Sequence, residues 1–295
     1  MRRYLRQRLW QEYEAFATRD LSEFSVAYFF VDGVAERLHA GLPREAGLCA
    51  WGITEDGRKV LLHLAPGTKE DTASCTAFFE DLKRRGRADP LLAVTDGAPG
   101  LIRAVETCFP RALRQRCLVH RTRNLRSKAP ENQWPEIALR ARGCYEAASP
   151  ALAAVLRDDF VAAYERDFPA VVQCFRDDFE ACIAHLRFPL RHRRGIRTTN
   201  LLERLFGEER RRTKVIPHAF GERPVLKLMY AAVIRAADRW RGLTVGEFEQ
   251  RQLRAIRDEL DRAHAARRAP DHERVPVEVI QQGTDLTSQS ELVRA

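Results

Sequence analysis

The stretch SVAYFFVDG, residues 25–33, decides the fold class of this chain of 295 residues. It is a short run of apolar, aromatic and β-branched residues closed by Asp-Gly, which predicts a buried strand that delivers Asp32 at its end. The apolar run Leu91–Val94 leads into Asp96-Gly97 in the same way. Because neighbouring parallel strands bring their ends together, we expect Asp32 and Asp96 to lie close to each other. Either Asp-Gly pair taken alone is also typical of an ordinary turn.

The residues around these two strands predict a mixed α/β core. The runs GLCAWGI and KVLLHLA are separated by an Asp-Gly pair, which is a strong hairpin signal. The expected order is a helix at 4–17, strands at 25–33, 47–53 and 59–65, a helix at 71–85, a strand at 91–94, a helix at 99–108, a strand at 112–117, and a basic helix from His120 to Pro130. Strands and helices therefore alternate after an initial β-meander.

The second half of the chain has a different pattern. Residues 131–188 are helical in periodicity throughout and are punctuated by prolines, which predicts an inserted helical bundle. Further helices are expected from near Asn200, at 225–240 and at 244–267. We therefore predict five segments: an N-terminal helix at 1–24, the first part of the core at 25–130, the helical insertion at 131–198, the second part of the core at 199–268, and a loose tail at 269–295.

The charge of the chain favours a polyanionic partner. Lys and Arg total 50 against 41 Asp and Glu, a formal net charge of +9 with a pI near 9.5. The excess is concentrated in Arg111–Lys128, which contains no acid, and in His185–Lys214, where Glu203 stands among many arginines. Planar guanidinium groups suit phosphate oxygens, although a solvated arginine-rich surface is the alternative interpretation.

The cysteines and the apolar segments indicate a cytoplasmic protein. Seven widely spread cysteines do not resemble the disulfide framework of a small secreted domain. The N-terminus has no apolar signal region, and no segment approaches the roughly 18 apolar residues that span a bilayer. We therefore expect a protein of the reducing cytoplasm.

A third carboxylate completes a candidate metal site. Paired carboxylates are the usual protein ligands of Mg²⁺, which keeps several waters. Glu203 follows the predicted insertion and is isolated within the densest basic cluster, so it is the best candidate to join Asp32 and Asp96. The alternative interpretation is that Glu203 is an ordinary acid in the first turn of a helix capped by Asn200, where the helix dipole favours negative charge.

Three ordered blocks carry a resemblance to a known family. They are YFFVDG around Asp32, LLAVTDGAPGLIRAVETCFPRALRQRCLVHRTRNL with Asp96, Cys117 and His120, and RTTNLLERLFGEERRRTKVIPHAF with Glu203. From about Phe16 to Trp240 the chain resembles the mutator-type transposases of bacterial insertion sequences, which are DDE transposases.

The resemblance implies a fold, a reaction and a cofactor. The fold would be a ribonuclease H-like mixed sheet flanked by helices and interrupted by an all-helical insertion. The reaction would be metal-dependent cleavage at transposon ends followed by strand transfer into target DNA. Asp32 would bridge two Mg²⁺ ions, for which Mn²⁺ can substitute, while Asp96 and Glu203 would each complete one ion. A homo-oligomer on DNA is expected, because two transposon ends are handled together.

Relatives usually carry a sizeable DNA-binding region before the first aspartate, whereas residues 1–31 alone precede Asp32 here. We therefore expect most of that region to be missing. Three readings remain open: an active catalytic core, an inactive copy that at most binds DNA, and a structure-specific nuclease on the same fold.

The predicted DNA contacts are basic residues around the third acid and in the Cys-x-x-His region. They are Arg121, Arg123, Arg197, Arg204, Arg210, Arg211, Arg212 and Lys214. Arg210 and Lys214 share a helical face with Glu203 and could hold the scissile strand. Such contacts to phosphates position DNA without reading its sequence.

Two motifs have competing interpretations. Cys117 and His120 form the Cys-x-x-His pair that the resemblance includes, and we expect them to brace the active-site strand and helix. Together with Cys182 and His185 they could instead form a four-ligand zinc site. Trp134 is expected in the core rather than as a platform for a flipped base.

Overall fold

The computed structural model describes residues 2–36, 45–66, 71–200, 222–237 and 241–268. Its strands are β1 (Val26–Glu36), β2 (Glu45–Thr54), β3 (Lys59–Pro66), β4 (Leu92–Thr95) and β5 (Leu113–Arg116). Its helices are α1 (Arg2–Thr18), α2 (Thr72–Arg84), α3 (Pro99–Cys108), α4 (Leu118–Arg126), α5 (Trp134–Tyr145), α6 (Pro150–Tyr164), α7 (Pro169–Arg176), α8 (Phe179–Ile183), the 3-10 helix η1 (Ala184–Arg187), α9 (Leu190–Ile196), α11 (Glu222–Ala237) and α12 (Glu247–Arg268).

The five strands form one mixed sheet in the order β3-β2-β1-β4-β5. The pairs β1–β2 and β2–β3 are antiparallel, whereas β4 is parallel to both β1 and β5. The β2–β3 hairpin turns at Gly57, whose φ of +89° is a conformation that favours glycine. The mixed α/β class and the hairpin that the sequence predicts are therefore confirmed.

Both faces of the sheet are covered, which explains why residues 25–33 are almost continuously apolar. Successive side chains of a strand point to opposite faces. Phe29 packs against Phe79 on the face covered by α2 and α3, and Tyr28 and Phe30 belong to the core on the other face, with α1, α11 and α12. A strand that is buried on both sides lacks the polar alternation of a half-exposed one.

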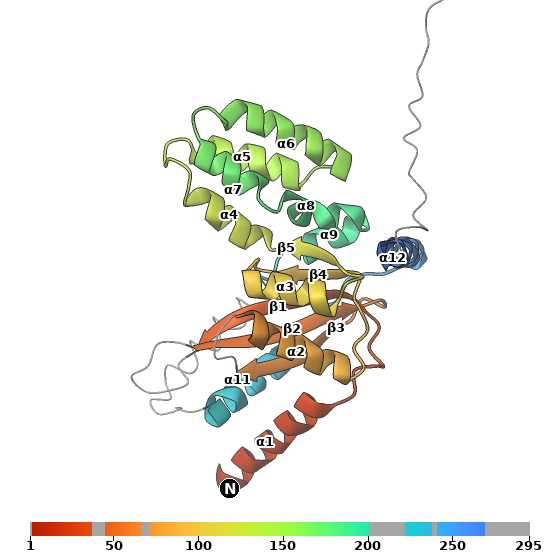
Figure 1. Cartoon of the computed structure of the whole chain (residues 1–295). Helices are drawn as coiled ribbons and strands as arrows, with labels where there is room; N and C mark the ends of the chain where they lie inside the picture. Colours follow the sequence, from red (N-terminus) through yellow and green to blue (C-terminus); the bar gives the residue numbers. More distant parts are fainter. Residues whose placement is uncertain (1, 37–44, 67–70, 201–221, 238–240, 269–295) are drawn as a thin grey trace, which may run out of the picture.

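The helical segment from α4 to η1 has a hydrophobic core of its own. Phe160 and Phe175 stack there with ring centroids 3.9 Å apart, and Tyr145 and Phe179 pack around them. Figure 1 shows helices α5, α6 and α7 at the end of the molecule opposite α1, with β5 and α4 between them and the rest of the sheet. The uniformly helical pattern of residues 131–188 is confirmed.

Prolines mark the beginnings of several of these helices. Pro99, Pro150 and Pro169 each occupy the first turn of a helix, where the missing backbone N–H removes no intrahelical hydrogen bond. The Ser149 hydroxyl caps α6 by accepting a hydrogen bond from the backbone N–H of Leu152 at 3.2 Å. The prolines that punctuate the sequence are therefore helix starts.

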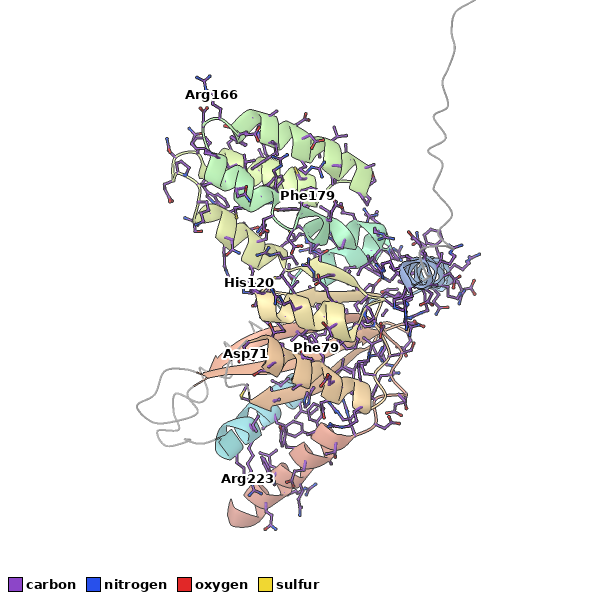
Figure 2. All side chains as sticks on the ribbon, in the orientation of Figure 1. Asp71, Phe79, His120, Arg166, Phe179 and Arg223 are labelled. Carbon is purple, nitrogen blue, oxygen red and sulfur yellow. The ribbon has the colours of Figure 1, made fainter. Side chains whose placement is uncertain are left out.

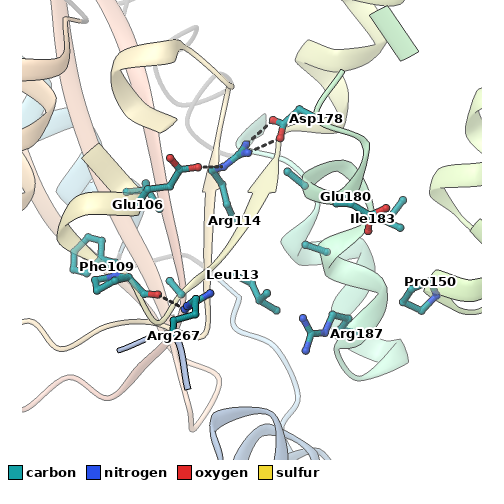
Figure 3. Close-up of a pocket in the computed structure, with 15 residues that line it drawn as sticks. Glu106, Phe109, Leu113, Arg114, Pro150, Asp178, Glu180, Ile183, Arg187 and Arg267 are labelled. Atoms are coloured by element: carbon teal, nitrogen blue, oxygen red, sulfur yellow. Dashed lines mark hydrogen bonds and ion pairs between the residues drawn. The ribbon is translucent and has the colours of Figure 1, made fainter. Parts of the chain in front are cut away.

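Ion pairs join the helical segment to the sheet. Both terminal nitrogens of Arg114 on β5 donate to the carboxylate of Asp178, which follows α7, and Arg114 Nε lies 3.4 Å from Glu106 on α3 (Figure 3). Arg116 Nη1 lies 3.1 Å from Asp177. Asp178 has a φ of +60°, a left-handed conformation that Asp and Asn tolerate better than most residues.

A cavity of about 530 Å³ lies at this junction, and Figure 3 shows its lining. Its charged residues interact within the chain. Arg187 pairs with Glu259 at 2.7 Å, and Arg267 donates a hydrogen bond to the carbonyl oxygen of Pro110 at 2.9 Å. The charged side chains of this cavity are therefore engaged in contacts within the chain.

Several predictions fall partly or wholly outside the described residues. The helix expected from near Asn200 and the tail at 269–295 lie outside them. The helices expected at 225–240 and 244–267 correspond to α11 and α12. In the part of the chain that the structure describes, no helix is both long enough and apolar enough to cross a membrane.

Candidate active site at the ends of strands β1 and β4

The register of the sheet brings Asp32 and Asp96 to the same level. The parallel pairing of β1 with β4 ends at Phe30 and Val94, and each aspartate lies two residues beyond that pair on its own strand path. Adjacent strands are about 4.8 Å apart. The expectation that the two aspartates lie close together therefore agrees with the pairing of the strands.

One detail of the prediction is wrong: β1 does not end at Asp32. The strand continues through Gly33 to Glu36, because β2 keeps pairing with it on the other side, and Asp32 lies opposite Cys49. Only the pairing of β1 with β4 stops before Asp32. The Asp-Gly pair is thus not a turn, and the candidate site lies just beyond the end of the pairing between β1 and β4.

Asp32 is a buried carboxylate in the sheet. Its exposed fraction is 4%, and it is on the sheet face that also carries Tyr28 and Phe30. Burial raises the pKa of the neighbouring Cys49 thiol above its ordinary value, and the negative charge of Asp32 raises it further. The carboxylate of Asp32 is therefore buried within the core of the sheet.

Asp96 is held by the turn that follows β4. It is half-buried, and its Oδ1 accepts a hydrogen bond from the backbone N–H of Ala98 at 2.9 Å. Gly97 between them has a φ of +92°, and a Cβ placed on it would lie 2.4 Å from Nε of Arg116. Glycine is therefore required here both by its backbone conformation and by the close approach of Arg116, a requirement that the sequence alone did not reveal.

We predict that Gly97→Ala destabilises the chain by roughly 1–3 kcal/mol, because the substitution forces a residue with a Cβ into a disfavoured conformation. It also displaces Arg116 or the turn that holds Asp96. Urea-induced unfolding measures the loss. The matched control is Gly143→Ala in α5, where an added Cβ meets nothing within 4 Å. That control should stabilise the helix by about 0.5–1 kcal/mol. Equal effects of the two substitutions would contradict the prediction.

Cys117 links β5 to the segment that leads toward Glu203. The backbone N–H and the hydroxyl of Thr199 both donate to Cys117 Sγ at 3.4 Å, and the N–H of Leu118 donates to the carbonyl oxygen of Arg197 at 3.0 Å. The N–H of Cys117 itself donates to the carbonyl oxygen of Thr95 at 2.7 Å. The chain at residue 199 is therefore fixed beside the residue that precedes Asp96.

The Cys117 thiol has a pKa below its ordinary value. Burial raises this pKa, but the hydrogen bonds that His120 and Thr199 make to the sulfur outweigh burial. Figure 2 shows His120 at the level where α4 meets the sheet, between Phe79 and Phe179. These contacts agree with the expectation that Cys117 and His120 brace the strand and the helix. Thr199, the partner that completes the contact, was not predicted.

Helix α9 is fixed to the same face of the sheet as Asp32. The hydroxyl of Tyr28 on β1 lies 2.7 Å from Nδ1 of His192, and Nε2 of His192 lies 3.1 Å from the carbonyl oxygen of Thr244. A carbonyl accepts only, so Nε2 carries the proton and Nδ1 accepts from Tyr28. Burial lowers the pKa of His192, which agrees with a neutral ring.

Glu203 lies outside the described residues, as do five of the predicted DNA contacts: Arg204, Arg210, Arg211, Arg212 and Lys214. Arg123 is exposed on α4, and Arg197 is half-buried with its Nη1 2.8 Å from Glu146.

The prediction that Arg121 contacts DNA is corrected by its position. Its exposed fraction is 1%, its Nη1 lies 3.3 Å from a carboxylate oxygen of Asp177, and its Nη2 donates to the carbonyl oxygen of the same residue. Arg121 therefore connects α4 to the end of α7 in the interior and is not available to a phosphate.

The alternative of a four-ligand zinc site finds no support in the described residues. No three His, Cys, Asp or Glu side chains gather there closely enough to hold a metal ion. The backbone N–H of His185 donates to Oε1 of Gln115 at 2.8 Å, while Nε2 of Gln115 donates to the carbonyl oxygen of Cys182 at 3.0 Å. Burial lowers the pKa of His185 to about 4, and the charges of Arg197 and Arg193 lower it too. Cys182 and His185 thus cover the edge of β5.

Comparison with known proteins identifies the family. The profile of the family described as Transposase, Mutator family, matches residues 4–242. The transposase of insertion sequence element IS6120 from Mycolicibacterium smegmatis is 32% identical over 235 residues, covering 79% of this chain and 73% of that protein. The IST2 transposase of Acidithiobacillus ferrooxidans is 32% identical over 206 residues, or 70% of each chain. The IS1081 transposase of Mycobacterium tuberculosis is 28% identical over 234 residues, with 77% and 55% covered. These matches span the sheet and the helical segment alike, and the chain belongs to the Mutator family of insertion-sequence transposases.

Proposed function

We propose that this chain is the catalytic core of a DDE-type transposase, in which Asp32, Asp96 and Glu203 together hold two Mg²⁺ ions. The observation that supports the proposal best is the register of β1 and β4, in which each aspartate follows the last paired residues, Phe30 and Val94, by two positions. Ligand sites in open α/β sheets occur at the carboxyl ends of such strands. Membership of the family implies a DNA-processing enzyme. The type of chemistry is inferred from Asp32, Asp96 and Glu203.

The described residues fit Mg²⁺ in their chemistry. Two carboxylates from separate strands supply the hard oxygen ligands that Mg²⁺ prefers, and Mg²⁺ sites in proteins keep several waters rather than a complete cage. Asp32 is the more buried of the two, which suits a ligand shared by both ions. When bound, the ions would stabilise the negative charge that develops on the phosphate, on the attacking oxygen and on the leaving oxygen.

The position of Thr199 supports Glu203 as the third ligand. Thr199 is fixed to Cys117, whose backbone bonds to Thr95, and Glu203 follows four residues later. Thr199 is thereby connected through Cys117 to Thr95, the residue that precedes Asp96. The contact between α9 and Tyr28 fixes the segment that precedes Thr199 on the face of the sheet that carries Asp32.

The architecture also supports a ribonuclease H-like core. A five-stranded mixed sheet has helices on both faces, and the helical segment lies between β5 and residue 200. In the proposed reaction Asp32, Asp96 and Glu203 would hold the ions, and the attacking group would be first water and then the freed 3′ hydroxyl. Exposed arginines such as Arg123 would bind the phosphates of the strand. We propose that the chain acts as a homo-oligomer on DNA, with one copy for each transposon end.

Metal removal tests the proposal. The full chain is incubated with a labelled duplex that carries the terminal repeats flanking the gene, with Mg²⁺, with Mn²⁺ or with EDTA. We expect nicking at the repeat boundary with either metal and none with EDTA, and joined products when target DNA is added. Salt-dependent DNA binding without nicking, by a chain shown to be folded, would instead support a non-catalytic DNA-binding protein. Cleavage of branched duplexes without joining would support a nuclease.

A further inference from the structure

Three of the five large apolar side chains that are exposed in the described part of the chain lie on two neighbouring helices, α5 and α6. Leu139 on α5 is 68% exposed, and Leu152 and Val155 on α6 are 43% and 58% exposed. Single exposed apolar residues are common on protein surfaces, whereas a group of them on one surface marks an interaction site. The outer surface of α5 and α6 therefore differs from the rest of the described surface.

The sequence of α6 is typical of a helix that is covered on all sides. Its 15 residues include three charged ones, Arg157, Asp158 and Asp159, and the others are apolar or aromatic. A helix that is apolar all round is normally buried all round. One side of α6 packs into the helical core through Phe160. The other side is exposed and carries Ala151, Leu152, Val155, Ala162 and Ala163.

The exposed residues of the two helices form one surface. Burial raises the pKa of the Cys144 thiol on α5 to about 11, and the charge of Asp159 on α6 raises it further. Asp159 lies one turn after Val155, so the side of α6 that carries both residues adjoins α5. Gly143, next to Cys144, faces open space, because an added Cβ would meet nothing within 4 Å. Leu139 lies one turn before Gly143, so a position without a side chain stands among the exposed apolar residues.

The charges of this surface favour a second copy of the chain over DNA. Helix α5 carries two arginines and one glutamate, and α6 carries one arginine and two aspartates, so α5 has a net charge of +1 and α6 of −1. DNA binding requires an excess of positive charge, which the two helices together lack. Arg142 on α5 and Asp159 on α6 are exposed, and neither forms an ion pair with a described residue. The two helices are therefore complementary to each other in charge.

We propose that two copies of the chain associate through the outer surface of α5 and α6, about a two-fold axis that places α5 of each copy on α6 of the other. In such an interface the same surface meets itself, so the apolar residues are covered and unlike charges face each other. Gly143 allows close approach because it has no side chain. The proposal deepens the homo-oligomer of the proposed function, on which it rests. Figure 1 shows α6 at the end of the molecule opposite α1, separated from the sheet by the other helices of the segment.

The size of the surface predicts a weak dimer. Helices α5 and α6 have 12 and 15 residues, so each is about 20 Å long at about 1.5 Å per residue. Two such helices about 10 Å apart offer about 400 Å² per copy, or about 800 Å² in total. Stable complexes bury roughly 1,200–2,000 Å². We therefore expect association at micromolar or higher concentrations, which a shared DNA substrate strengthens by raising the effective concentration.

Sedimentation equilibrium of the full chain in EDTA, without DNA, tests the proposal independently of cleavage. Concentrations from about 1 µM to about 1 mM cover the range in which weak contacts dissociate. We expect an equilibrium between monomer and dimer. Val155→Gln should weaken dimerisation by about tenfold or more, because a two-fold interface contains the substitution twice. The monomer should stay folded by circular dichroism, since Val155 is exposed there and Gln favours a helix more than Val does.

Gly143→Gln should have opposite effects on the monomer and on the dimer. Gln has the higher helix propensity, so the substitution should raise the Tm of the dilute chain. Its side chain occupies the position where the second copy approaches, so dimerisation should weaken by about tenfold. The matched control is Phe248→Gln at the start of α12, where a 64% exposed apolar side chain lies outside this surface. That control should change dimerisation by less than about twofold.

Two charge-reversing variants test the arrangement of the helices. Arg142→Glu and Asp159→Arg each place like charges opposite each other in the proposed dimer, so each chain alone should dimerise more weakly than the parent. When the two variant chains are mixed, each changed charge faces an opposite charge on the other chain. A heterodimer should therefore form about as strongly as the parent dimer.

Four results would overturn the proposal. They are a parent chain that stays monomeric over the whole range both with and without a transposon-end duplex, equal weakening by Phe248→Gln and Val155→Gln, no effect of Gly143→Gln, and no recovery in the mixture. Failure of the proposed function is distinguishable. If the parent and Asp32→Asn dimerise alike while the parent does not nick DNA with Mg²⁺, the proposed function fails and the interface stands. If the parent nicks and joins DNA but does not associate, the interface fails and the proposed function stands.

Discussion

The Asp32→Asn variant is expected to fold as the parent chain does and to lose metal-dependent DNA cleavage. Asparagine has the same shape and removes the charge that would bind both ions. Metal-ion catalysis contributes several kcal/mol to barrier lowering, and each 1.4 kcal/mol is a factor of about ten, so the rate should fall by about 10³-fold or more. Quantified nicking of a labelled transposon-end duplex measures the loss.

Thermal unfolding provides a second measurement on the same variant. Mg²⁺ that binds the folded chain raises its Tm through mass action, and it should raise the Tm of the parent chain but not of Asp32→Asn. The control is Asp56→Asn, which changes an aspartate in the β2–β3 turn whose side chain is 54% exposed. That control should keep both cleavage and the Mg²⁺-dependent rise in Tm. Cleavage by Asp32→Asn at the parent rate would rule out its role as a metal ligand.

The Asp178→Asn variant is expected to lose about 3 kcal/mol of stability, since removing one partner of a buried pair leaves the other charge without compensation. The Arg114 and Asp178 side chains are 18% and 15% exposed, and Arg116 lies 3.7 Å from the same carboxylate. Asparagine tolerates the left-handed backbone at this position, so the change isolates the charge. Urea-induced unfolding followed by circular dichroism measures the loss.

The same substitution should loosen the helical segment from the sheet. Arg114 and Arg116 lie on β5, next to the strand that leads to Asp96, while Asp178 lies between α7 and α8. We therefore expect faster amide exchange in α7 and α8 than in the parent chain. The matched control is Asp158→Asn on α6, whose 70% exposed side chain pairs with Arg157. An exposed pair contributes about 0.2–1 kcal/mol. Equal losses in the two variants would contradict a special role for the junction.

Much of the fold follows from local sequence patterns. The hairpin, the strands that carry the two aspartates, and α3 at Pro99–Cys108 were predicted from apolar runs, turn residues and helix-start signals. These patterns are reliable where the burial of a strand or of one helix face requires apolar residues to recur at a fixed spacing along the sequence. The continuation of β1 beyond Asp32 was missed, because Asp-Gly is a turn signal unless a partner strand keeps pairing past it.

The basic clusters show where sequence reasoning reached its limit. Arg111–Lys128 contains no acid, and its charge predicted a DNA-binding surface. In the structure, acids distant in sequence neutralise much of it: Asp178 pairs with Arg114, and Asp177 with Arg116 and Arg121. The partners lie some 60 residues away, so no local pattern could reveal them.

The sequence by itself determined the mixed α/β class, the helical segment, and the identity of Asp32, Asp96 and Glu203 as candidate ligands. Each of these depends on residue type and local period, and the family blocks carry the same information. Only the tertiary structure decided that Asp32 and Asp96 each follow the last paired residues of β1 and β4 by two positions, that Thr199 closes onto Cys117, and that Arg121 is buried while Leu139 and Val155 are exposed. Those facts depend on strand register and on packing between segments far apart in the chain, and both are set by the free energy of the whole fold.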